Sequence, residues 1–303
     1  MAGYVGSRIV NTLTNLDGVA IDGAAITNST IVPVTPFTFR NRIINGNLSN
    51  PINQRGAASI TASTGYTYDR WYYDGSTYLY QGIEDKNVNN GTYVISWVGA
   101  GINAAWKVST DTTANNGPDA TTGFTSVSNG GTFTVNEGTE YSKHLWIRFD
   151  GTLANLDKVQ VEEGTVATPF EHRPIGTELA LCQRYAIMFG NNTVDSTGDG
   201  GNLAVGWIDT IDKFSGMIFL PTTMRERPAL NASGTNNFEI AYTDLNISTV
   251  SGVNISQILG LTTKNLVFLT ISSGQTNQHR NQPASLRYAD NSLTDTFLLE
   301  SEL

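Results

Sequence analysis

The sequence has few groups that could crosslink the chain or hold a metal. Cys182 is the only cysteine, so no disulfide can form within the chain. The three histidines, His144, His172 and His279, lie far apart, and none belongs to an HxH or HExxH pair. We therefore expect no metal and no cofactor, and we expect hydrophobic cores and contacts between subunits to stabilise the fold.

Charged residues are also scarce. They make up 15% of the 303 residues, whereas typical soluble domains have about 25%. The formal net charge is -9, and a negative surface repels the phosphates that a nucleic-acid-binding surface must neutralise. We therefore expect no nucleic-acid partner.

Long apolar runs are missing as well. Nowhere do about 18 apolar residues follow one another, as a membrane-spanning helix requires. The first residues, MAGYVGSRIVNTLTNL, lack the basic stretch and following apolar run of a signal peptide. The sequence predicts a soluble chain without a signal peptide and without membrane insertion.

Asparagine, threonine, serine and glycine are abundant instead. Their preference is for turns and strand faces over helix interiors, because short polar side chains compete for backbone hydrogen bonds. The length suits about two domains, since single cores stop growing near ~250 residues. We predict an all-β protein with two β domains and a short extension.

The extension comprises residues 1–40, and Pro33 and Pro36 mark its end because proline removes backbone donors that a strand needs. Its apolar residues stand in short extended segments: Val19, Ile21, Ile26, Ile31 and Val34. About 40 residues cannot build a core without a metal, a disulfide or another chain. We predict an N-terminal arm that is ordered by oligomerisation or by docking onto a larger assembly. A flexible tail is the alternative.

Residues 41–175 read as short strands separated by polar turns. Aromatic and β-branched residues alternate with polar ones in YTYDRWYYDG, GTYVISWVG and KHLWIRFDG, which predicts an antiparallel sandwich or barrel. Trp71 and Tyr73 share one face of a predicted strand, and we expect Trp71 in the core. Arg70 and Tyr72 lie on the other face, where Tyr72 is the better candidate for the surface.

One helix is predicted, over residues 176–190. Apolar residues recur there at three- and four-residue steps: Leu179, Cys182, Ala186 and Phe189. Thr177 can cap its start, and Gly190 follows its end. After this linker helix, residues 191–303 read as strands again, with longer apolar runs such as FSGMIFLP and NLVFLTISS, which predict a second, better buried β-sandwich.

Four segments, in this order, resemble those of phage tail-fibre and virion structural proteins. They are NRIINGNLSNPINQRG from Asn41, YTYDRWYYDG from Tyr66, VQVEEGTVATPFEHRPIGTELALCQRYAIMFG from Val159 and FLPTTMRERPAL from Phe219. The resemblance covers residues 41–190 most clearly. The chain departs from it at Asn53, where an aromatic residue is common in related proteins, and at Ala186, where a second tyrosine is common; both changes bear on packing.

The resemblance implies a jelly roll similar to carbohydrate-binding modules for residues 41–175. It also implies a non-catalytic fibre or spike protein, usually a homotrimer, that binds host cell-surface polysaccharide. We expect it to be located in the virion, in a tail or capsid appendage, after assembly in the host cytoplasm, with residues 1–40 contacting other virion proteins. A purely structural capsid fibre, decoration protein or collar protein is the alternative.

Aromatic residues of the first β domain, residues 41–175, are the candidates for glycan binding. Sugars lay their C–H faces on flat aromatic rings while their hydroxyls meet amides and carboxylates. The candidate rings are Tyr72, Tyr78, Tyr80, Trp97 and Trp106. For each of them, a place in the core or on the sheet surface is the alternative.

An enzyme that depolymerises glycans is the third alternative. Glycoside hydrolysis needs two carboxylates about 5 to 10 Å apart, and carboxylates such as Glu84 and Asp150 are plentiful, but the sequence does not show which of them meet. Glu171, His172 and Arg173 follow one another on an extended segment, which favours structural salt bridges. The chain has no GxSxG elbow, no P-loop and no dinucleotide fingerprint. We expect no enzyme.

Overall fold

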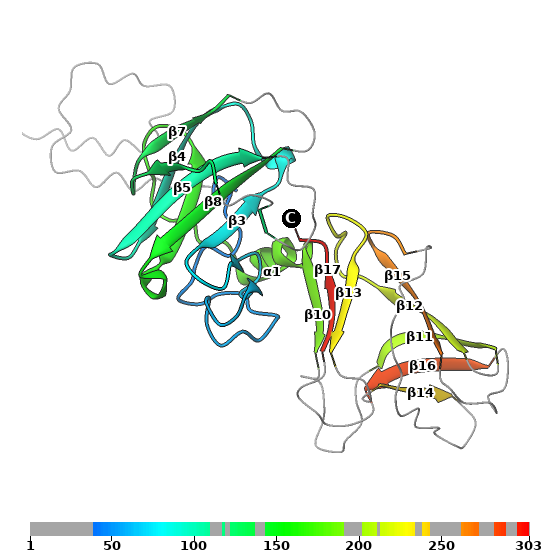
Figure 1. The fold of residues 1–303 in the computed structure, drawn as a ribbon. Coiled ribbons are helices and arrows are strands. Elements are labelled where there is room, and N and C mark those ends of the chain that lie inside the picture. The colour runs from blue at the N-terminus through cyan, green and yellow to red at the C-terminus, as the bar shows by residue number, and fades with distance from the viewer. Residues whose placement is uncertain are drawn as a thin grey trace, which may run out of the picture. The chain divides into compact units, whose positions relative to one another are not determined.

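The computed structural model describes residues 39–109, 117–118, 122–136, 143–190, 202–210, 213–233, 238–242, 262–272, 282–288 and 296–302 (Figure 1). Strands form most of the regular structure in these ranges, and α1 (Ile175–Gln183) is their one α-helix. The predicted all-β class is therefore confirmed. No helix in the described ranges is long and apolar enough to cross a membrane.

The predicted N-terminal arm lies almost entirely outside the described residues. Only Phe39 and Arg40 of residues 1–40 are described. The five apolar residues on which the predicted arm was based fall in the part that is not described: Val19, Ile21, Ile26, Ile31 and Val34.

The N-terminal module, residues 39–174, contains two antiparallel sheets. The six-stranded sheet has the order β1-β2-β3-β8-β5-β6 and the three-stranded sheet the order β7-β4-β9. The first is built from β1 (Gly65–Tyr66), β2 (Tyr72–Tyr73), β3 (Leu79–Ile83), β8 (His144–Gly151), β5 (Ile102–Ser109) and β6 (Thr125–Val127). The second is built from β7 (Thr132–Val135), β4 (Gly91–Val98) and β9 (Asp157–Glu163), and two 3-10 turns, η1 (Asp85–Asn87) and η2 (Leu153–Asn155), connect strands.

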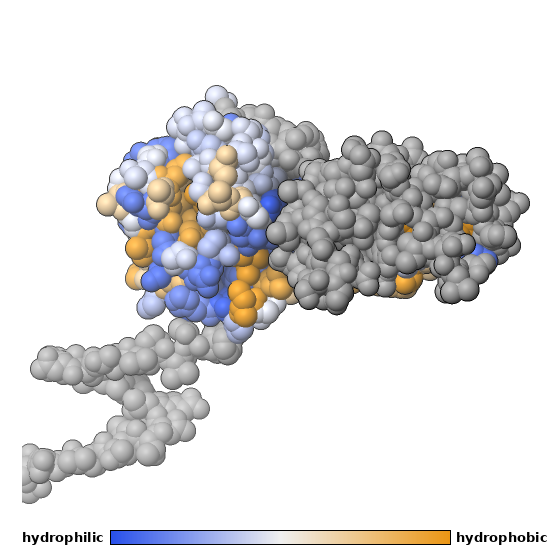
Figure 2. Space-filling view, turned by 90° about the horizontal axis from the view of Figure 1, so that it is seen from below, coloured by the Kyte–Doolittle hydropathy of each residue, from blue (hydrophilic) through white to orange (hydrophobic). Residues whose placement is uncertain are grey.

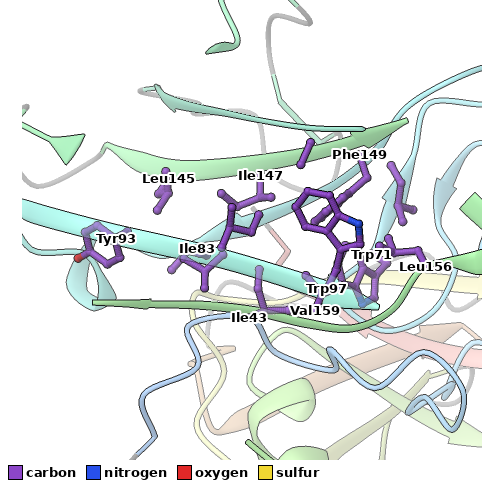
Figure 3. Close-up of a cluster of buried hydrophobic side chains, with 14 of the residues drawn as sticks. Ile43, Trp71, Ile83, Tyr93, Trp97, Leu145, Ile147, Phe149, Leu156 and Val159 are labelled. Atoms are coloured by element: carbon purple, nitrogen blue, oxygen red, sulfur yellow. The ribbon is translucent and has the colours of Figure 1, made fainter. Parts of the chain in front are cut away.

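One hydrophobic core lies between these two sheets (Figure 3). Leu145, Ile147 and Phe149 of β8 point into it, because successive side chains of a strand alternate between the two faces of a sheet. Val159 of β9 enters from the other sheet. Trp71 has no exposed surface and its ring lies 6.1 Å from Phe149, which confirms the predicted core position. Burying each large apolar side chain contributes about 1.5–3 kcal/mol, so this core holds the sheets together.

An extended segment that precedes β1 lies along β9. The backbone N–H of Arg42 donates to the carbonyl of Val161 at 2.7 Å, and Val159 donates to the carbonyl of Gly46 at 2.9 Å. The buried side chain of Asn41 donates to Val159 at 3.0 Å and accepts from the N–H of Val161 at 3.1 Å. The segment therefore extends the three-stranded sheet beyond β9.

The predicted helix over residues 176–190 is wrong in its last part. The helix α1 (Ile175–Gln183) ends before the strand β10 (Ala186–Gly190) begins. β10 pairs with a strand much later in the chain, in a register that places Ile187 opposite Leu299. A short apolar run such as AIMF fits a strand as well as a helix, and tertiary pairing decides between the two.

The C-terminal module also contains two antiparallel sheets. The three-stranded sheet has the order β10-β17-β13 and the five-stranded sheet the order β14-β16-β11-β12-β15. Its further strands are β11 (Asn202–Thr210), β12 (Lys213–Phe219), β13 (Ala229–Ser233), β14 (Phe238–Tyr242), β15 (Leu266–Ser272), β16 (Pro283–Tyr288) and β17 (Thr296–Glu300). One core joins the sheets, with Phe297 and Leu299 from the first and Phe214, Ile218 and Leu286 from the second.

Buried ion pairs link the two modules just after β17. Glu302 has no exposed surface and pairs with Arg70, which is 1% exposed. Arg55 lies 3.2 Å from Glu302 and 2.9 Å from Glu300. Arg225 donates to the backbone carbonyl of Glu302 at 2.8 Å. The prediction that Arg70 lies on the open face of a strand is wrong: its φ of 73° places it in a turn, and its guanidinium serves this junction.

Candidate functional site

The candidate site is the face of the six-stranded sheet that points away from the core. Because Leu79 and Phe149 point into the core, their chain neighbours Tyr80 and Arg148 point the other way. Tyr80 is the cross-strand partner of both Arg148 and Tyr72, so a row of side chains runs across β2, β3 and β8. The part of the described surface that Figure 2 displays is largely hydrophilic, with hydrophobic areas between the polar ones.

Aromatic rings surround Tyr80 and Arg148 on this face. The ring of Tyr80 lies 6.3 Å from that of Tyr72, 6.1 Å from that of Tyr78 and 5.8 Å from that of Phe124. The guanidinium of Arg148 lies over the Tyr78 ring at 4.2 Å and over the Phe124 ring at 4.7 Å. A cation over an aromatic face gains about 0.5–2 kcal/mol, so these contacts hold Arg148 in place within the cluster.

The turn before β3 places Tyr78. One carboxylate oxygen of Asp74 accepts the backbone N–H groups of Ser76, Thr77 and Tyr78 at 2.9, 2.8 and 3.0 Å. Burial alone would raise the pKa of Asp74, but these hydrogen bonds favour the charged carboxylate and lower the pKa overall. The ionised Asp74 therefore closes the turn and directs Tyr78 onto the sheet face.

Only part of the cluster reaches solvent. Tyr80 is fully buried, and burial together with the charge of Asp74 raises the pKa of its hydroxyl. Tyr72 and Tyr78 are half-buried, and burial and Asp74 also raise the pKa of Tyr72. Tyr72 and Tyr80 therefore stay protonated at neutral pH.

An open hollow of about 610 Å³ lies where β5 begins and β6 ends. Beside Trp97, its polar lining consists of Asn103, Ser126, Ser128, Asn129 and Asp150. Asn103 donates to the carboxylate of Asp150 at 2.6 Å, and the two are cross-strand partners on β5 and β8. The side chain of Asn129 accepts a hydrogen bond from the backbone N–H of Trp97 at 3.0 Å and donates to the backbone carbonyl of Trp97 at 2.8 Å. These contacts fix two amides and a carboxylate beside the open space.

Part of the hollow's polar lining shares the sheet face of the tyrosine cluster. Asp150 follows Arg148 by two residues on β8, so both side chains point away from the core. Ser126 is the partner of Ala105, which is in turn the partner of Arg148. Amides, hydroxyls, a carboxylate and partly exposed rings thus occur together, and this set of groups can bind a ligand that is rich in hydroxyls.

The five predicted rings are separated in the structure. Tyr72, Tyr78 and Tyr80 come together, with Tyr80 buried beneath the other two. Trp97 lies in the wall of the hollow but is only 7% exposed, and its ring packs inside the module. Trp106 points into the core, where it stacks on a phenylalanine at 4.8 Å. Their role in ligand binding stays a prediction.

Sequence reasoning did not single out Asn103, Asn129 or Arg148. The alternation in HLWIRFDG could have assigned both Arg148 and Asp150 to the outer face. Asn103 gave no such signal, because its partner Asp150 is 47 positions away. Asn129 belongs to the turn cluster SNGG, and nothing in such a cluster distinguishes a side chain that binds backbone from one in solvent.

A smaller pocket of about 150 Å³ lies beside α1. In its lining, Arg173 pairs with Glu178 at 3.1 Å and with Glu171 at 3.6 Å. His172 instead packs edge-on against the ring of Phe170 at 4.9 Å. Arg173 and Glu171 therefore form the structural ion pair that the sequence favoured.

Comparisons with protein-family models, with curated proteins and with solved structures found no match to this chain. The resemblance to phage fibre proteins thus depends on the four sequence segments quoted above.

Proposed function

We propose that the protein is a non-catalytic adhesin of a bacteriophage particle, a fibre or spike protein that binds glycans on the host surface. One observation carries the proposal: Asn103 and Asp150, which line the hollow, point to the same sheet face as the half-buried rings of Tyr72 and Tyr78. The resemblance of four ordered segments to phage tail-fibre and virion proteins supports the same reading.

Sugar recognition needs the groups that this face presents. The amide of Asn103 and the carboxylate of Asp150 are within hydrogen-bond distance of each other, so they can bind neighbouring hydroxyls of one sugar ring. The rings of Tyr72 and Tyr78 can accept C–H faces of an adjoining sugar. An open hollow gives weak binding at each site, and linking copies raises the avidity by about 10²- to 10⁴-fold.

The finer fold belongs to this proposal as well. If residues 41–46 count as a strand, one sheet has the order 41–46, β9, β4, β7 and the other contains β3, β8, β5, β6. Several neighbours come from distant parts of the chain, such as β4 and β9 in one sheet and β3 and β8 in the other, as in the Greek keys of a jelly roll. This order supports the jelly roll that the resemblance to carbohydrate-binding modules implies.

The location in the virion rests on the resemblance and on the arm. Residues 1–40 form a segment too short to build a core of its own without a metal, a disulfide or another chain, which suits a segment that other virion proteins bind. We infer that this arm attaches the protein to the particle after assembly in the host cytoplasm, and that the β modules meet the host polysaccharide.

Binding to purified host polysaccharide, measured by isothermal titration calorimetry, tests the proposal. We expect Asn103→Ala to weaken binding about tenfold, because one lost hydrogen bond to a ligand costs about 1–1.5 kcal/mol. Asn90→Ala is the matched control, because Asn90 is also an exposed asparagine but does not line the hollow. It lies just before β4, and the hollow borders Trp97 near the other end of that strand.

Three results would contradict the proposal. Equal binding by the Asn103 and Asn90 variants would place the site elsewhere. Failure of the unaltered protein to bind cells or polysaccharide would favour the purely structural alternative. Shortening of the polysaccharide during incubation would favour an enzyme.

A further inference from the structure

The five-stranded sheet of the C-terminal module exposes an apolar face. Three large apolar residues of this sheet are exposed: Val205 by 56%, Trp207 by 36% and Phe219 by 71%. Ile208 and Ile218, next to them in sequence, are buried in the module's core. Because strand side chains alternate, the three exposed residues lie on the face opposite that core.

The exposed residues form one continuous group with their cross-strand partners. Val205 lies opposite Met217, Met217 opposite Phe268, and Phe219 opposite Leu266. Met217, Phe268 and Leu266 are half-buried. The rings of Trp207 and Phe268 meet edge to face at 6.1 Å. We call this group the apolar face; its members are Val205, Trp207, Met217, Phe219, Leu266 and Phe268.

The apolar face has no charged member. The charged residues of its two central strands stand at the turn that joins them, namely Asp209 of β11 and Lys213 of β12. The polar residues that pair with members of the apolar face, Ser215 and Ser285, are neutral, and so is Thr270, the next partner of Ser215. Contiguous apolar patches of this kind mark interaction sites on soluble proteins.

We propose that the apolar face is the surface through which copies of this chain associate. The net charge of -9 makes two copies repel each other, and a contact costs least where neither copy presents a charge. A second copy also presents the same apolar face at the same concentration, which favours closed, symmetric assemblies. This inference does not depend on glycan binding.

The size of the apolar face fits the centre of an interface. The exposed parts of Phe219, Trp207 and Val205 amount to about 300 Å², since a large aromatic side chain has about 150–250 Å² to bury. A standard interface buries about 800 Å² on each partner and has an apolar centre with a polar rim. The apolar face would form that centre, and the half-buried side chains of Thr270 and Ser285 beside it would contribute to the rim.

Light scattering coupled to size-exclusion chromatography tests the proposal on the full chain. The unaltered protein is expected at two or more times the chain mass of 32.7 kDa. Val205→Asp is expected to weaken the association on the order of 100-fold, because it would bury an unpaired charge in the contact. Val166→Asp makes the same change at a residue that is 76% exposed in the N-terminal module, and it should keep the unaltered mass.

The outcomes separate clearly. A monomeric unaltered protein overturns the proposal, whether or not the protein binds glycan. An oligomer that survives Val205→Asp also overturns it, because the contact then lies elsewhere. Should Val205→Asp lose its cooperative thermal unfolding, Phe219→Ser decides at the more exposed position: a folded monomer supports the proposal and an oligomer overturns it.

Discussion

Arg70 shows how single residues join the two modules. Its guanidinium pairs with Glu302, donates to the carbonyl of Gly82 and lies over the ring of Tyr185 at 3.6 Å. Burial alone would lower the pKa of Arg70, but the charge of Glu302 raises it overall, so the arginine stays charged. A buried charge is tolerated only with its partner, and Glu302 supplies that partner.

Neutralising Glu302 tests this ion pair. We expect Glu302→Gln to lower the free energy of unfolding by about 3–5 kcal/mol, because it leaves the buried Arg70 unpaired. Glu226→Gln is the matched control, since Glu226 pairs with Arg225 at 2.9 Å but its side chain is 60% exposed. We expect that change to cost less than about 1 kcal/mol. Chemical denaturation measures both, and equal costs would contradict the account.

Asp69 gives a pH dependence at the same junction. Burial raises its pKa to about 6, although Arg55 and hydrogen bonds from Gln54 partly oppose this shift. A folded-state pKa above the unfolded value of 3.8 means that the protonated group favours the fold. Its contribution to stability is complete below about pH 4 and is lost as the pH rises through about 6.

We therefore expect Asp69→Asn to remove part of this pH dependence. Between pH 4 and pH 7, the free energy of unfolding of the unaltered protein should fall relative to that of the variant by about 2 kcal/mol. Urea denaturation at several pH values measures the difference. Parallel curves for the two proteins would show that Asp69 does not titrate in this range.

Among the secondary-structure elements, the existence of the strands was easier to predict than the residue at which the helix ends. The segments KHLWIRFDG and GTYVISWVG alternate with a period of two, and they form β8 (His144–Gly151) and β4 (Gly91–Val98). The helix end was missed because residues 186–190 take their structure from pairing with β17. Likewise, Trp71 could be assigned to the core from the alternation of the strand predicted there. The position of the Asn103 side chain beside Asp150 depends on a strand that is distant in the sequence.

Gly117, which lies between β5 and β6, packs onto the ring of Tyr72. Gly117 has a φ of 70°, and a Cβ atom there would lie 2.6 Å from the Tyr72 ring. Gly56 has nearly the same φ of 68°, but a Cβ atom there would meet nothing within 4 Å. The two glycines therefore share the backbone requirement and differ only in the contact.

We expect Gly56→Ala to cost about 1–2 kcal/mol from the left-handed backbone alone. Gly117→Ala should cost about 1–3 kcal/mol more, because the methyl group overpacks against Tyr72. Chemical denaturation compares the two variants. A cost for Gly117→Ala no larger than that for Gly56→Ala would contradict the packing of Gly117 against the Tyr72 ring.

For the whole molecule, the described part of the chain begins with a segment that is already tied to the N-terminal module. Both modules have cores that begin at or after Ile43, and Arg40 pairs with Glu162 at 3.3 Å. We expect a chain lacking residues 1–38 to keep the thermal unfolding of the full chain but to fail to join phage particles. Immunoblots of purified particles measure incorporation, and normal incorporation would contradict the anchoring role of the arm.

We propose that host glycan binds the outer face of the six-stranded sheet, and hydrogen–deuterium exchange of the full chain, with and without host polysaccharide, locates the bound surface. We predict slower exchange in β5 (Ile102–Ser109), β6 (Thr125–Val127) and the end of β8 near Asp150, and no change in β10–β17. Slower exchange confined to other strands, or no change anywhere at saturating polysaccharide, would contradict the claim.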